Sequence, residues 1–146
     1  MQRLYKFLAL PWRGKGLYLN AAFWLLAVKA GLYLLTFERL RGWLRFDKPT
    51  GKPAEMEEMR AIVEAIERIS QVLAPLRINC LPQALVGHRL LGRKGFNVQL
   101  KIGVLKHPGD RLAAHAWLEY QGRVILGDLR GLEQFAAFPT LGAVRR

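Results

Sequence analysis

The chain has 146 residues, of which 51% are hydrophobic, and a formal net charge of +12. This length and composition fit a single domain with a substantial core and exclude an extensively disordered chain. The single cysteine excludes an internal disulfide and any multi-cysteine zinc or iron–sulfur site, and one free thiol is typical of a reducing cytosol.

The positive charge is spread over two parts of the chain and is not gathered in one arginine-rich tract. Residues 1–45 carry eight Lys/Arg against one acid, and residues 77–146 carry eleven against four, whereas residues 54–74 carry two against five. A basic surface attracts nucleic acid, anionic lipid or acidic peptide, and charge alone does not choose among them. Bases and aromatics do not alternate along a strand, which argues against a stacking platform for single-stranded nucleic acid.

The most apolar stretch covers residues 17–37 and approaches the roughly 20 residues that span a bilayer. Lys29 lies near its middle, and a central lysine costs about 3 kcal/mol on insertion scales. A true span is therefore the least favoured of three interpretations. The others are a helix buried against the rest of the domain and a helix lying on a membrane surface or a partner. We expect a cytoplasmic protein, and peripheral membrane contact stays open.

Residues 46–53 contain two prolines and a glycine, which predicts a linker. We therefore expect a basic and apolar helical segment over residues 1–53 and a core over residues 54–146, within one compact unit. Residues 54–73 are predicted to form an amphipathic helix that ends before Pro75, because apolar side chains recur at three- and four-residue steps. These side chains are Met59, Ile62, Ile66, Ile69 and Leu73.

A second helix is predicted over residues 80–94, with Pro82 in its first turn and Gly95 as its C-terminal stop. The hydrophobic period then changes to alternation, which predicts strands over residues 98–104, 113–120 and 123–126. From Gly131 onward we expect a loop. The order predicts an α+β fold with the helices on one side of a small antiparallel sheet. The expected packing anchors of the tail are Phe135, Phe138 and Leu141.

Cys80 stands at the start of the second predicted helix. The helix dipole stabilises a thiolate there, and the thiolate is the nucleophilic form of cysteine. The free backbone N–H groups of that turn can bind a developing oxyanion, and the side chain of Asn79 is a further candidate donor. The alternative is a buried structural cysteine, which is common for this residue type.

His115 is the candidate partner base, because it lies on a predicted strand between small alanines that leave room for a second catalytic group. The alternative is a core histidine with a satisfied hydrogen bond. A tight hairpin turn at residues 121–122 would pair Trp117 with Leu126 and His115 with Asp128. Asp128 would then orient the imidazole, and Trp117 and Leu126 would wall the site. A slip of one residue would put Asp128 on the wrong face.

Four segments resemble the transglutaminase-like leader peptidases of lasso-peptide biosynthesis, and the resemblance is close over residues 77–129. The N-terminal part is also similar, with a basic start, a long apolar helix and then Phe37-Glu38-Arg39-Leu40. The four segments are Cys80-Leu81-Pro82-Gln83-Ala84-Leu85, residues 91–95, Lys101-Ile102-Gly103-Val104 and Ala114-His115-Ala116-Trp117-Leu118-Glu119.

The resemblance implies a papain- or transglutaminase-like fold and a cysteine peptidase that removes the leader of a ribosomal precursor peptide. It implies a catalytic triad of Cys80, His115 and Asp128, with no cofactor and no metal. Residues 1–53 are too few and too apolar for a leader-recognition domain, so we expect a recognition protein in trans and an ATP-dependent lasso cyclase as partners. We expect no nucleic-acid partner.

Two other classes of function remain. One is a catalytically silent peptide-binding module on the same fold. The other is a basic protein of membrane surfaces or nucleic acid. The order of Cys80, His115 and Asp128 along the chain argues against the silent module, because all three residue types of a triad are present.

Overall fold

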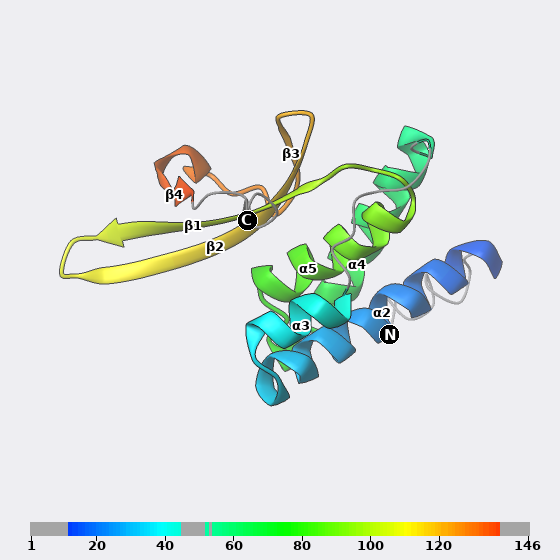
Figure 1. The fold of residues 1–146 in the computed structure, drawn as a ribbon, viewed down its shortest axis with the longest axis horizontal. Helices are drawn as coiled ribbons and strands as arrows, with labels where there is room; N and C mark the ends of the chain where they lie inside the picture. The colour runs from blue at the N-terminus through cyan, green and yellow to red at the C-terminus, as the bar shows by residue number, and fades with distance from the viewer. Residues whose placement is uncertain (1–11, 45–51, 53, 138–146) are drawn as a thin grey trace.

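A computed structural model describes residues 12–44, 52 and 54–137, without the side chains of residues 12, 13 and 41. The helices lie on one side of a four-stranded antiparallel sheet of order β3-β2-β1-β4, and the β1–β2 hairpin extends beyond them (Figure 1). The predicted α+β fold is confirmed. The elements are α2 (Trp12–Leu34), α3 (Phe37–Leu44), α4 (Met56–Val72), the 3-10 turn η1 (Ala74–Leu76), α5 (Cys80–Arg93), β1 (Gln99–His107), β2 (Arg111–Tyr120), β3 (Arg123–Leu126), the 3-10 turn η2 (Leu132–Gln134) and β4 (Ala136–Ala137).

The helix that Cys80 begins, α5, packs against the sheet and also against α2 and α4. α4 buries four of the five side chains of the predicted apolar stripe, and the fifth, Leu73, is the partly buried C-cap before η1, which contains Pro75. α5 ends just before Gly95, whose φ of 86° lies in the left-handed region that favours glycine. One continuous core therefore holds α5, and with it Cys80, in a fixed position on the sheet.

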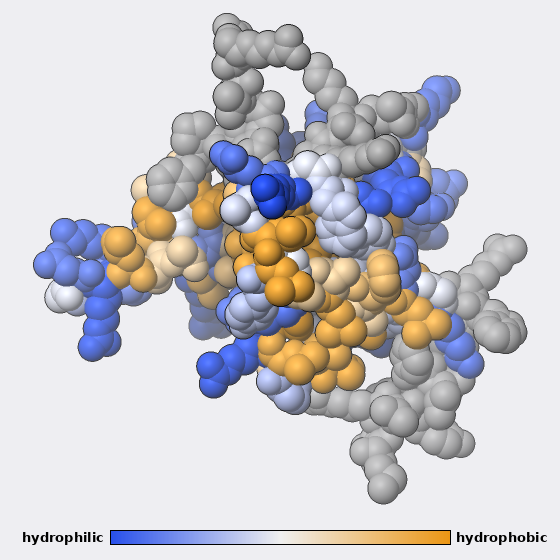
Figure 2. Space-filling model, turned by 60° about the horizontal axis from the view of Figure 1, so that its bottom comes forward, coloured by the Kyte–Doolittle hydropathy of each residue, from blue (hydrophilic) through white to orange (hydrophobic). Residues whose placement is uncertain are grey.

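The apolar helix α2 buries one side and exposes the other. Leu25 and Val28 are fully buried, and the ammonium of Lys29 donates a hydrogen bond to the carbonyl of Arg77 at 2.8 Å. The opposite side exposes a stripe of large apolar side chains, which contributes to the orange surface in Figure 2. These are Leu19, Phe23, Leu26, Tyr33 and Leu34. By length and composition alone, the stretch Gly14–Leu34 would suffice to cross a bilayer.

The hairpin between β2 and β3 has the predicted two-residue turn. Gln121 and Gly122 have φ angles of 50° and 77°, the left-handed pair that matches the twist of the flanking strands. The tail departs from the prediction of a loop, because β4 pairs with β1 at Gly103 and Val104. Phe138, Leu141 and nearly all of the predicted linker lie outside the described residues.

A β-bulge changes the register between β2 and β3. Tyr120 pairs with Arg123 as predicted, but Leu118 pairs with Leu126, so one residue of β3 is extra. The predicted pair of Trp117 and Leu126 is therefore wrong. The physical reason is burial, because the bulge lets two consecutive aliphatic side chains of β3 contact the core. These side chains are Ile125 and Leu126.

Candidate active site

Cys80 is the first residue of α5, and its half-buried side chain packs against the core. Asn79 precedes it as the N-cap in extended conformation, and its side chain makes no capping hydrogen bond. The first-turn N–H groups of a helix have no intrahelical partner, and Pro82 contributes none. The start of α5 thus combines a thiol with free backbone donors, which suits a thiolate and an oxyanion.

Gln83, one turn into α5, folds its side chain back over the start of the helix. Its amide Nε2 donates a hydrogen bond to the carbonyl of Ile78 at 3.1 Å. Sequence reasoning quoted Gln83 within a motif and gave it no role. The signal was its place three residues after Cys80, which puts it above the same first turn.

His115 lies on β2 with one ring nitrogen held by backbone. Its Nε2 lies 2.6 Å from the carbonyl oxygen of Gly127. Because a carbonyl only accepts, Nε2 carries the proton and Nδ1 is left to accept one. The ring also stacks on Trp117 at 6.1 Å between centroids and 16° between planes, and it meets Phe135 at 5.9 Å. The imidazole is thereby fixed in tautomer and in plane.

Trp117 is 4% exposed, and its indole N–H donates to the Glu119 carboxylate at 2.9 Å. Its indole stacks on the His115 ring, and its role as a wall of the substrate site stays a prediction. Leu126 does not share that face: it pairs with Leu118, and both leucine side chains approach Gly87 of α5. The predicted common wall of Trp117 and Leu126 is therefore wrong, and the bulge is the cause.

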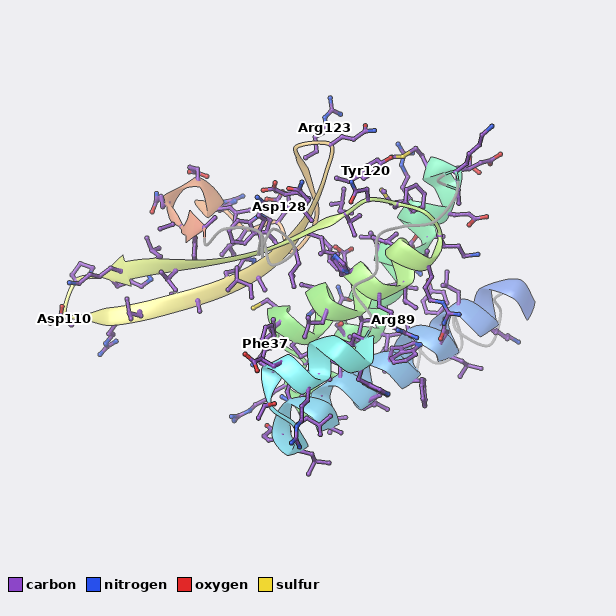
Figure 3. The ribbon with its side chains drawn as sticks, in the orientation of Figure 1. Phe37, Arg89, Asp110, Tyr120, Arg123 and Asp128 are labelled. Atoms are coloured by element: carbon purple, nitrogen blue, oxygen red, sulfur yellow. The ribbon has the colours of Figure 1, made fainter. Side chains whose placement is uncertain are left out.

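Asp128 is the second residue after β3 and is exposed. It lines an open hollow of about 760 Å³ beside the start of α5 (its position is labelled in Figure 3). The pair of Asp128 and His115 across two strands is not formed, because β3 ends at Leu126. The hollow is lined by Glu67, Ser70, Gln71, Ala74, Arg77, Ile78, Asn79, Gln83, Gly127 and Asp128.

The three predicted catalytic residues are not hydrogen-bonded to one another among the residues that the structure describes. The segment after the bulge nevertheless connects their surroundings. Gly127 holds the His115 ring through its carbonyl, and the next residue, Asp128, lines the hollow that Asn79 also lines, beside Cys80. The sequence did not single out Gly127. Its φ of 83° and its close approach to the backbone of β2 explain why a glycine stands there.

The other titratable residue of note is His88, in the third turn of α5. Burial lowers its pKa from 6.5 to about 4, so the imidazole is neutral at physiological pH. Within the described ranges, no three His, Cys, Asp or Glu side chains gather in a way that would hold a metal ion.

Comparison with known proteins identifies one family. A family model described as Transglutaminase-like superfamily matches residues 22–140, which include α5 and every strand that carries the candidate residues. No curated protein and no solved structure gave a significant match.

Proposed function

The chain belongs to the transglutaminase-like superfamily, and from this premise we propose that it is a cytoplasmic cysteine peptidase of lasso-peptide maturation. In this proposal it removes the leader from a ribosomal precursor peptide. It acts with a separate leader-recognition protein and, after cleavage, with the ATP-dependent lasso cyclase. The support for this finer assignment is the string of residues around Cys80 and His115.

One observation carries the proposal: the chain's single cysteine is the first residue of α5, where the helix dipole and the free first-turn N–H groups favour a thiolate and an oxyanion. In the proposed reaction, the Cys80 thiolate attacks the scissile carbonyl and a thioester replaces the peptide bond. Nδ1 of His115 takes the thiol proton and gives it to the departing amine. Water then cleaves the thioester, which returns the thiol and releases the leader as an acid.

Asp128 is the third member of the proposed triad. Its carboxylate would support the imidazolium that forms during turnover, while the Gly127 carbonyl holds the ring. The hollow that Asp128 lines beside Asn79 and Gln83 offers hydrogen-bonding groups to a peptide that reaches Cys80. The backbone N–H of Cys80 and the Asn79 amide are the proposed oxyanion donors.

The test incubates the precursor peptide with the purified chain and the leader-recognition protein, and mass spectrometry follows the free leader. We expect Cys80→Ala to abolish cleavage while circular dichroism shows an unchanged fold. Undiminished cleavage by this variant would remove Cys80 as the nucleophile. We also expect slower cleavage without the recognition protein, because leader capture raises the local peptide concentration. Equal rates with and without it would refute the partner.

A second candidate function is a silent peptide-binding module. The observation that favours it is that no hydrogen bond joins Cys80, His115 and Asp128 within the described part of the chain. The same assay separates the two candidates. A chain that binds the precursor and leaves it intact, with and without the recognition protein, is a binding module. Release of the leader by the wild type but not by Cys80→Ala identifies a peptidase.

A further inference from the structure

One edge of β2 has no strand partner beside His115. On one side, β2 pairs with β1 along its length, from Arg111 to Glu119. On the other side, β3 pairs only with residues 118–120. Over residues 111–117, that side of β2 therefore lacks a paired strand among the described elements. Gly127 approaches the backbone of β2 at Ala116 and Trp117, where a Cβ on the glycine would lie 2.9 Å from the Ala116 carbonyl oxygen and 3.1 Å from the Trp117 Cα.

The geometry of the turn tells which backbone groups this edge presents. In a two-residue hairpin, the residues flanking the turn exchange hydrogen bonds, so Tyr120 directs its N–H and C=O toward β3. Backbone groups alternate in direction along a strand, so the even-numbered residues of β2 direct theirs to the same side as Tyr120. The approach of Gly127 to the Ala116 carbonyl oxygen agrees with this direction. Leu112 and Ala114 therefore direct their N–H and C=O away from β1, at the open edge.

This edge is accessible and lies next to the candidate base. Ala114 is exposed and directly precedes His115, and the Leu112 side chain is 70% exposed. The hairpin that carries both residues projects beyond the helices as far as its tip at Asp110 (Figure 3). An unpaired row of donors and acceptors is a template for another strand, and a short alanine beside it admits that strand closely.

We propose that an extended peptide binds as an added strand on this edge, paired with the backbone of Leu112 and Ala114. The inference rests on the proposed function and names how its substrate is held. Neighbouring strands lie about 4.8 Å apart, so the added peptide runs directly beside His115. Main-chain hydrogen bonds supply the affinity in this mode of binding, and side chains supply the selection.

The charge of the hairpin favours an acidic occupant. On the hairpin, Lys101, Lys106 and Arg111 stand against two acids: Asp110, which pairs with Lys106 at 3.1 Å, and Glu119, which accepts a hydrogen bond from the Trp117 indole. The whole chain carries a net charge of +12, which attracts acidic peptides to it from solution. The occupant we infer is therefore an extended, acidic stretch of the substrate peptide.

Amide hydrogen exchange in the full Cys80→Ala chain tests the proposal without any cleavage. The probe is an N-acetylated octapeptide amide of alternating Val and Glu, and the control is its analogue N-methylated at every residue. We expect saturating probe to slow exchange at Leu112 and Ala114 by about tenfold or more. Exchange at Ala113 and His115 should not change, because their N–H groups already face β1. The N-methylated analogue should protect none of them.

Unchanged exchange at Leu112 and Ala114 with saturating probe would overturn the proposal, and so would equal protection by the N-methylated analogue. Protection that is present without peptide and disappears on dilution would assign the edge to a second copy of the chain instead. Because the test chain lacks its nucleophile, its result is independent of cleavage. Loss of edge binding with leader release intact would sink this inference alone, and edge binding without leader release would sink the proposed function alone.

Discussion

The contact between α5 and the sheet is close enough to be tested with one methyl group. Gly87 lies on α5 under the sheet, and a Cβ placed there would lie 2.7 Å from Leu118 Cδ1 and 2.8 Å from Leu126 Cδ2. Both leucines are buried, at 0% and 2% exposure, so neither side chain can move aside freely. Gly92 lies on the same helix, and a Cβ there would meet nothing within 4 Å. The two glycines therefore form a matched pair.

The pair isolates the free energy of packing. Either Gly→Ala change removes the helix penalty of glycine, about 1 kcal/mol. Overpacking costs about 1–3 kcal/mol, and two contacts below 3 Å place Gly87→Ala in the upper part of that range. We expect Gly92→Ala to be stabilising and Gly87→Ala to be less stable than it by about 2–3 kcal/mol. At about 3–4 °C per kcal/mol for a chain of this size, the melting temperatures should differ by about 6–12 °C.

Thermal and urea unfolding, followed by circular dichroism, measure both variants against the wild type. The same variants should be assayed for leader cleavage, because displacement of α5 moves Cys80 relative to β2, which carries His115. Equal stability of the two variants would refute the close approach of α5 to Leu118 and Leu126.

Three further predictions concern single groups. Asp128→Asn should retain the fold by circular dichroism and slow leader cleavage by about tenfold or more, because the imidazolium loses a supporting charge; an undiminished rate would exclude the carboxylate from the triad. The free energy of unfolding should fall as the pH is lowered from 6.5 to about 4, because His88 takes up a proton in the unfolded chain while burial keeps it neutral in the folded chain. At about 1.36 kcal/mol for each unit of pKa difference, the loss reaches about 3 kcal/mol. His88→Gln should lack this loss, and an identical pH profile would contradict the assignment. Finally, high-salt or carbonate washes should release the protein from membranes, because Lys29 near the middle of α2 is bonded to the carbonyl of Arg77; retention after both washes would show that α2 spans.

Local signals in the sequence account for most of the fold. The apolar stripe of α4, Gly95 after α5 and the strands β1 and β2 each have a signal among neighbours in sequence, and the structure has each of them within three residues of the predicted position. Two elements were not predicted as separate elements from the sequence. α3 is stabilised by its close approach to α2, where a Cβ on Gly31 would lie 2.7 Å from Leu40. β4 is two residues long and exists through its pairing with β1.

The candidate site shows the same division between local and tertiary causes. The turn at Gln121 and Gly122 follows from position, because two residues separate two apolar runs. The bulge at Ile125 does not, since Val124, Ile125 and Leu126 are all apolar and only the core decides which of them it buries. A prediction of strict alternation therefore placed His115 opposite Asp128, whereas the bulge shifts the register by one residue and β3 ends at Leu126.

This one-residue shift separates two tasks that a single carboxylate was predicted to perform. A carbonyl fixes the tautomer and plane of an imidazole as well as a carboxylate does, and the Gly127 carbonyl does so here at 2.6 Å. A carbonyl carries no net charge, so it stabilises an imidazolium less than a carboxylate would. In the proposed reaction, the charge of Asp128, which lines the hollow together with Asn79, would act across space on the imidazolium that forms during turnover. In Asp128→Asn the two tasks are separable, because Gly127 continues to orient the ring while the charge is gone.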